Sequence, residues 1–211
     1  MTIFSKIALS TVTALSVISL TACDSPKDAS EKNFGVALSQ YLEKKGQLCL
    51  NNKKWPVDIS EMDISMQKNL PSGRVSQMAA LESVGLVKSE DMSVQGTGFN
   101  QGVTLKIKRY TLSDAAKPYL HEESRLCWGQ RALEKVVKWE GPIVLGDYQE
   151  VKVTYLYKID NAADWASKPE IQNTFPAIKN AIDGAGTRET THVLKLTNNG
   201  WEAKGLNSDW K

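Results

Sequence analysis

Apolar residues recur at three- and four-residue steps in the first part of the chain, as on one buried face of a helix. This pattern predicts a helix from Phe34 that ends at Gly46. Ser60 with an acid three residues later opens a second, short helix to about Asn69, and a third helix ends at Gly85. Residues 34–85 are therefore predicted to be mainly helical.

Alternation of apolar and polar residues then predicts strands. Residues 103–110 and 190–197 alternate, and residues 151–159 show the pattern most clearly. A helix interrupted by Pro176 lies between the last two strands, and Asn199-Gly200 predicts a hairpin turn. One buried and one wet face favour an antiparallel sheet. The expected class is α+β, with a helical first part followed by a small antiparallel sheet under one helical layer.

The N-terminus has the order of a secretory signal, with Lys6 followed by apolar or small residues up to Leu20. This run of about 14 residues is shorter than the roughly 20 needed to span a membrane. The sequence Leu20-Thr21-Ala22-Cys23 that follows is similar to the lipobox of bacterial envelope lipoproteins. The alternative is an ordinary signal peptide with a chance cysteine.

The lipobox resemblance implies removal of residues 1–22 and acylation of Cys23, with several acyl chains giving stable attachment. It also implies a periplasm-facing protein. In enterobacterial lipoproteins an Asp directly after the cysteine opposes transfer to the outer membrane, so Asp24 favours the inner membrane, with the outer membrane still open. Residues 23–33, polar and containing Pro26, are expected to form a flexible lipidated tether.

Residues 34–121 resemble a winged-helix domain in their element order and in the phrases Met78–Val87 and Tyr110–Ser113. Such domains commonly bind DNA through the third helix. That helix carries Arg74 as its only base, and an exported chain does not meet the chromosome. Nucleic-acid binding is therefore not expected. Residues 122–211 are expected to form a separate antiparallel α+β domain. With its closing Gly200-Trp201 hairpin, this part of the chain is similar in pattern to uncharacterised proteobacterial lipoproteins.

Two of the three cysteines remain after Cys23 is assigned to the anchor, namely Cys49 and Cys127. An even pair in an exported chain predicts a disulfide. The loop between them is long, and the chain-entropy model credits its closure with roughly 4 to 5 kcal/mol. A redox-active pair would favour a Cys-x-x-Cys spacing, which this sequence lacks.

Charge and candidate chemistry add little. The chain has 26 Lys and Arg against 24 Asp and Glu, with the two signs interleaved, so no polyanionic partner is indicated. Only His121 and His192 could act as acid–base groups near neutral pH. Neither has a metal-ligand spacing, and no catalytic motif is found. No catalytic residue, metal or cofactor is predicted.

Tryptophan is the remaining candidate for recognition. Five of the six tryptophans fall in the second half, where most should be buried. Trp165, Trp201 and Trp210 are candidates for an exposed aromatic binding surface. The sequence thus favours a membrane-anchored, non-enzymatic protein-binding or scaffold module with an envelope protein as partner. The alternatives are an immunity or inhibitor lipoprotein against a toxin or envelope hydrolase, and a protein or enzyme acting on a cell-wall ligand.

Overall fold

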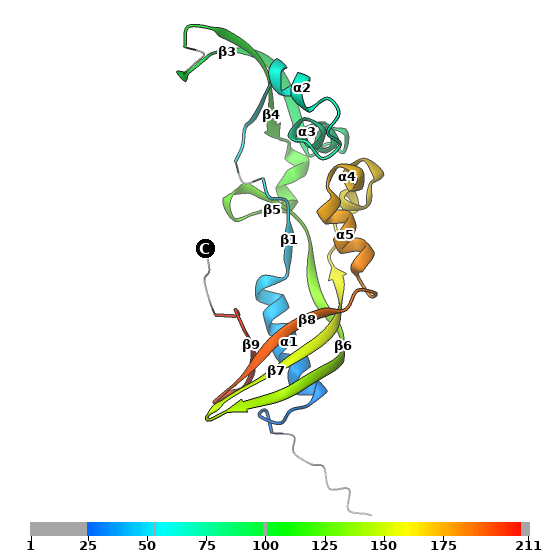
Figure 1. Cartoon of the computed structure of the whole chain (residues 1–211). Helices are drawn as coiled ribbons and strands as arrows, with labels where there is room; N and C mark the ends of the chain where they lie inside the picture. Colours follow the sequence, from blue (N-terminus) through cyan, green and yellow to red (C-terminus); the bar gives the residue numbers. More distant parts are fainter. Residues whose placement is uncertain (1–24, 53, 99–100, 208–211) are drawn as a thin grey trace, which may run out of the picture.

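Two antiparallel sheets and the helices packed on them form an elongated molecule (Figure 1). This computed structural model describes residues 25–52, 54–98 and 101–207. The large sheet lies at one end together with the start of the first helix, and the small sheet lies at the other end. The class is α+β, as expected.

The large sheet has the strand order β1-β6-β7-β8-β9, with β5 paired to β6 at its side. Its two longest strands form a hairpin, in which β6 is buried mainly near its start, at residues 126–128, and β7 mainly in its middle, between residues 151 and 157. The strands are β1 (Gln47–Cys49), β5 (Leu120–His121), β6 (Arg125–Leu145), β7 (Tyr148–Asp160), β8 (Thr190–Thr197) and β9 (Gly200–Ala203).

Helix α1 (Glu31–Lys45) packs on this large sheet. Its N-cap Ser30 accepts a hydrogen bond from the Asn33 amide, and it ends before Gly46, as predicted. Its buried face joins apolar side chains from β6, β7, β8 and β9 in one core. The members of that core are Phe34, Ala37, Leu38, Leu42, Val136, Val151, Val153, Tyr155, Tyr157, Leu194, Trp201 and Ala203.

The small sheet has the strand order β2-β4-β3 and carries two helices. The chain passes through β2 (Val57–Ser60), α2 (Glu61–Gln67), α3 (Arg74–Ser83), β3 (Val87–Gln95) and β4 (Thr104–Leu112). The short pieces η2 (Asp114–Tyr119) and η3 (Glu122–Ser124) then lead into β6. After β7 come η4 (Asp164–Ser167), α4 (Pro169–Thr174) and α5 (Pro176–Gly184).

A second core crosses the expected domain boundary between residues 121 and 122. It joins Leu81 of α3 and Val57 of β2 to Trp128 of β6, Ile171 of α4 and Ile178 of α5. The helices from the second half therefore pack with α3 and with Trp128 near the start of β6, whereas α1, from the first half, packs on β6, β7, β8 and β9 in the other core.

The packing of α1 on the large sheet also decides whether residues 34–121 form the expected winged-helix domain. From β2 to β4 the described chain has the expected element order, with β2 and β3 on either side of β4. The first helix of that pattern is missing from the unit, because α1 buries its apolar face on the large sheet. The structure thus shows helices with antiparallel sheets and no winged-helix domain over the described part of residues 34–121.

Strand β6 begins directly after η3, at Arg125. Its register with β7 shifts between Glu140 and Ile143, around Gly141-Pro142, and β6 continues to Leu145. The pairing of β6 with β7 on both sides of this bulge keeps the strand continuous.

Candidate functional site

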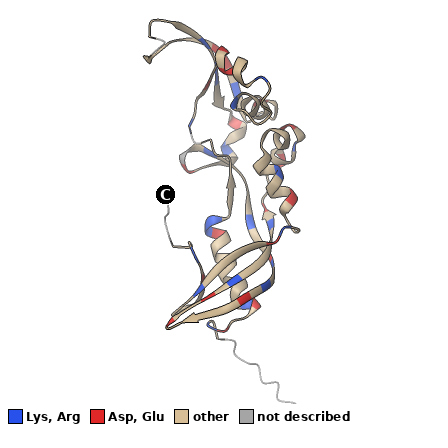
Figure 2. Cartoon of the chain, viewed as in Figure 1, with Lys and Arg blue, Asp and Glu red and all other residues tan. Residues whose placement is uncertain are grey.

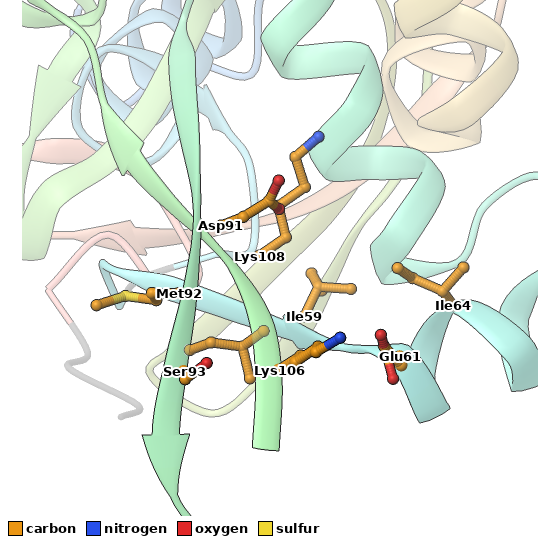
Figure 3. Close-up of a pocket in the computed structure, with 9 residues that line it drawn as sticks. Ile59, Glu61, Ile64, Asp91, Met92, Ser93, Lys106 and Lys108 are labelled. Carbon is orange, nitrogen blue, oxygen red and sulfur yellow. The ribbon is translucent and has the colours of Figure 1, made fainter. Parts of the chain in front are cut away.

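A groove of about 440 Å³ lies over the small sheet beside α2 (Figure 3). Apolar side chains from four elements contribute to it: Ile59 from β2, Ile64 from α2, Met92 from β3 and Ile107 from β4. Polar and charged side chains also line it, namely Glu61, Asp91, Ser93, Lys106 and Lys108. An apolar surface with charges of both signs around it is suited to contact with another protein.

Helix α2 forms one wall of the groove and leaves its apolar side chains in solvent. None of its residues is buried. Met62 and Met66 are exposed, Met66 at 74 %, and Leu70 just beyond the helix is 53 % exposed. We call Met62, Met66 and Leu70, which follow one another at steps of four residues, the distal apolar surface; Ile64 lies on the side of α2 that faces the groove. Apolar surface gathered in one place usually marks an interaction site.

The local sequence explains why this unburied helix forms directly after β2. Ser60 caps the helix: its hydroxyl oxygen accepts a hydrogen bond from the Asp63 amide at 3.1 Å, and the Asp63 carboxylate accepts from the Ser60 amide at 2.8 Å. This reciprocal capping box satisfies two otherwise unpaired amides. The Ser60 hydroxyl also donates to the Asp63 carboxylate at 2.6 Å, and this bond, together with the one from the Ser60 amide, lowers the pKa of Asp63, so the cap is charged near neutral pH.

The charges around the groove are balanced rather than of one sign. Asp91 of β3 lies opposite Lys108 of β4 in register, and Lys108 also approaches Glu82 at 3.9 Å. Burial raises the pKa of Tyr110, and the carboxylates of Glu82 and Asp91 raise it further. Figure 2 shows acidic and basic residues interspersed along the molecule.

A second pocket, of about 300 Å³, lies near the disulfide between β1, α3 and α5. Its lining is largely apolar and includes Leu48, Met78 and Trp128. Among the described residues, the buried Nδ2 of Asn52 and Nε of Arg131, both on lining residues, have no hydrogen-bond partner. An apolar pocket with a few polar groups is the usual form of a small-ligand site.

The predicted disulfide is present: the sulfur atoms of Cys49 and Cys127 lie 2.01 Å apart, and the two residues are paired between β1 and β6. Cys23 and Asp24, the predicted lipidation and sorting residues, lie outside the described residues, as does Trp210.

Of the three tryptophans predicted to form an exposed aromatic surface, the structure describes Trp165 and Trp201, and the prediction is wrong for both. Trp165 is 5 % exposed and packs edge-on against Tyr119 at 5.9 Å. Trp201 is 7 % exposed and packs edge-on against Phe34 at 5.1 Å. Both rings belong to the two cores, because a large flat ring fills the space between a helix and strands.

Trp201 also fixes the segment that was expected to be a flexible tether. Its indole N–H donates to the carbonyl oxygens of Lys27 and Asp28 at 3.2 and 3.1 Å. The Asn33 side-chain amide donates to the carbonyl oxygens of Ser25 and Asp28 at 2.8 and 2.9 Å. The chain from Ser25 onward is therefore bound to the end of the large sheet.

The two histidines make no shared site. His121 is exposed, whereas the His192 ring lies 4.2 Å from Tyr41 and its Nε2 lies 2.8 Å from the Lys204 carbonyl oxygen. Within the described ranges, no three His, Cys, Asp or Glu side chains gather as metal ligands would. No described helix has the length and hydropathy required to cross a membrane.

Sequence reasoning missed the distal apolar surface and the apolar end of the β6–β7 hairpin. A signal for each exists. The short helix after Ser60 carries two methionines and an isoleucine within seven residues, and Ile143-Val144-Leu145 places three apolar residues in a row beside a turn. Successive residues of a strand point to opposite faces, so such a run cannot be buried on one side.

In comparisons with known proteins, no family model, no curated protein and no solved structure matches the chain.

Proposed function

We propose that the chain is a bacterial envelope lipoprotein, anchored through acylated Cys23, that binds another envelope protein without catalysing a reaction. The distal apolar surface is the observation that carries the binding part of this proposal. A helix that buries none of its residues and exposes two methionines leaves apolar surface that a protein partner would cover.

Position supports the same function. The distal apolar surface and the groove lie at the end of the elongated molecule opposite to the start of α1 (Figure 1). An anchor at Cys23, close to that start in sequence, would leave the groove accessible away from the bilayer. The partner fitted by this surface has an apolar centre with charges of both signs around it, matching Glu61, Asp91, Lys106 and Lys108.

An immunity or inhibitor role is a specific form of this function, with an incoming toxin or an envelope hydrolase as the bound protein. A small-ligand function is a second candidate because of the pocket beside the disulfide, where Arg131 and Asn52 hold unpaired donors. Binding of a soluble cell-wall fragment that is lost in Arg131→Met, while the distal surface is intact, would favour this second candidate.

The anchor is tested by metabolic labelling with palmitate. We expect label on the wild-type protein and none on Cys23→Ala. A Cys23→Ala protein that still carries label would refute the anchor.

The binding surface is tested by photo-crosslinking in cells. A photo-reactive residue replaces Leu70 in one strain and Val36 of α1 in another; both positions are 53 % exposed. We expect one defined crosslinked protein from position 70 and none from position 36. Met62→Gln with Met66→Gln should abolish the product. Equal crosslinking from both positions, or a product unaffected by the methionine changes, would contradict the proposal.

A further inference from the structure

The turn end of the β6–β7 hairpin carries a continuous apolar surface. Ile143, Val144 and Leu145 are consecutive and exposed, Leu145 at 70 %. Tyr148, at the start of β7, is partly exposed opposite Leu145, and Trp139, four residues before Ile143 on β6, is also partly exposed. We call Ile143, Val144 and Leu145 the hairpin tip. Single exposed apolar residues are normal on a protein surface, but three in a row with neighbouring aromatic rings are not.

At the hairpin tip, β6 and β7 pair only with each other. β8 pairs with β7 only from Glu150 to Tyr155, whereas β6 and β7 remain paired as far as Leu145 and Tyr148. Within the described residues, neither α1 nor any other helix belongs with the tip to a core. No intramolecular packing therefore accounts for its composition.

The segment that follows Cys23 lies at this same end of the large sheet. Pro26 lies against Gly200, so closely that a Cβ on Gly200 would be 2.7 Å from the Pro26 carbonyl oxygen. Gly200 pairs with Thr197, the last residue of β8, which runs beside β7. Phe34 of α1 lies 5.4 Å from Trp139 of the hairpin.

Covalent geometry then limits how far an anchor could be from this end. Cys23 precedes Ser25 by two residues, which span at most about 7 Å of extended chain. The Ser25 carbonyl oxygen is itself held by Asn33 of α1. Acyl chains on Cys23 would therefore enter the bilayer close to the end of the sheet that carries the hairpin tip.

We infer that the hairpin tip inserts into the membrane interface beside the acylated cysteine and forms a second contact with the lipid. This inference rests on the proposed anchor. Ile143, Val144 and Leu145 enter the acyl boundary, and Trp139, farther from the turn, lies at headgroup level, where such rings are favoured; Tyr148, opposite Leu145, is level with the tip. Asp147, exposed in the turn, limits the depth because a carboxylate is costly in hydrocarbon.

Other charges near the tip do not oppose this contact. The Glu150 carboxylate binds the Lys204 ammonium at 2.6 Å, and Glu140 lies 3.8 Å from Lys152. With two attachment points at one end, the long body stands away from the bilayer and its distal apolar surface faces the periplasm. A single flexible anchor would let the body lie flat.

The test uses the full, lipidated protein in vesicles of phosphatidylethanolamine and phosphatidylglycerol. Leu145→Cys and, as a matched control, Met66→Cys are labelled with an environment-sensitive fluorophore; the two positions are 70 % and 74 % exposed. With Cys23 acylated and Cys49 bonded to Cys127, the introduced cysteine is the free thiol. We expect the label at 145 to be quenched by spin-labelled lipid and protected from iodide, and the label at 66 to show the reverse.

Three other results overturn the inference in distinguishable ways. If the protein floats with vesicles but the label at 145 remains accessible to iodide, the proposed anchor stands and the tip contact is refuted. Protection from iodide without quenching by lipid means that a second copy of the chain covers the tip. Protein that fails to float with vesicles refutes the proposed anchor, and the inference falls with it.

Discussion

Trp201 links the closing hairpin of the large sheet to the segment that follows Cys23. Its ring fills the core beneath α1, and its N–H is shared between the carbonyl oxygens of Lys27 and Asp28. Buried indoles usually find such a partner. Trp165 occupies the other core, but its N–H has no partner within the described residues. Two buried tryptophans thus differ in one hydrogen bond.

Trp201→Phe should separate that hydrogen bond from the packing. We expect a loss of about 1 kcal/mol in unfolding free energy for the hydrogen bond, in addition to the loss of ring volume, and faster amide exchange over residues 27–30. Trp165→Phe is the control, because it removes a similar volume and no hydrogen bond. For both variants, denaturant unfolding measures the free energy and mass spectrometry measures the amide exchange. Equal costs and unchanged exchange near Lys27 would contradict the role given to the indole N–H.

Asp58 and Arg109 join β2 to β4 through two hydrogen bonds of 2.7 Å. Hydrogen bonding from Arg109 holds the pKa of Asp58 below its ordinary value of 3.8, against a smaller opposing effect of burial. A lowered folded-state pKa means that the stabilisation is present above pH 3.8 and is lost as the pH falls through the folded-state pKa.

Asp58→Asn should therefore lower the free energy of unfolding near neutral pH and have no further effect in acid. Both side chains are about one third exposed, so the loss should stay below about 1 kcal/mol. Denaturant unfolding at a series of pH values measures it. Asp147→Asn serves as control, since Asp147 makes no ion pair within the described residues. A difference that persists below the folded-state pKa would contradict this assignment.

At the scale of elements, α2 depends on its cap because it has no buried face. Short helices are marginal in water and most gain their stability from packing. In α2, the capping box of Ser60 and Asp63 and the connection from β2 supply the stability that packing gives to most helices. The distal apolar surface is therefore displayed on a helix that could fray easily.

Ser60→Ala should loosen α2 specifically. We expect about 1 kcal/mol less local stability, with faster amide exchange over residues 61–67 and little change in α1, which has its own cap at Ser30. Amide exchange resolved by mass spectrometry makes the comparison within one protein. Uniformly faster exchange in both helices would mean that Ser60 stabilises the whole fold instead.

At the scale of the molecule, the disulfide joins strands β1 and β6 of the large sheet, beside the core that the two halves of the chain share. Cys49 of β1 and Cys127 of β6 are bonded across 78 positions of sequence. Leu50 and Trp128, the residues that follow them, both lie in the core shared by the two halves of the chain. The disulfide and this core therefore both hold the two halves of the chain together at the same place.

Replacing both cysteines by serine should cost up to about 4 to 5 kcal/mol of unfolding free energy in the chain-entropy model. Denaturant unfolding of the double variant against the wild type measures the loss, and reduction of the wild type should reproduce it. The folded wild-type protein should show no reactive thiol at position 49 or 127. Unchanged stability after reduction would contradict a structural role for the disulfide.

Much of the local structure follows from sequence because local interactions decide it. The stop of α1 at Gly46, the cap of α2 at Ser60 and the alternation of residues 151–159 depend on neighbours within a few positions. The Cys49–Cys127 pair also followed, since two cysteines allow only one pairing. Helix α4, by contrast, starts after Lys168 without a side-chain cap.

Only the tertiary structure decided what each apolar face packs against. Periodicity marks α1 as amphipathic, but it cannot say that α1 covers the large sheet instead of joining α2 and α3. The burial of Trp165 and Trp201 and the exposure of α2 and the hairpin tip follow from that choice. Hydrophobic burial is non-directional, so the partner of an apolar face is set by the arrangement of the whole chain.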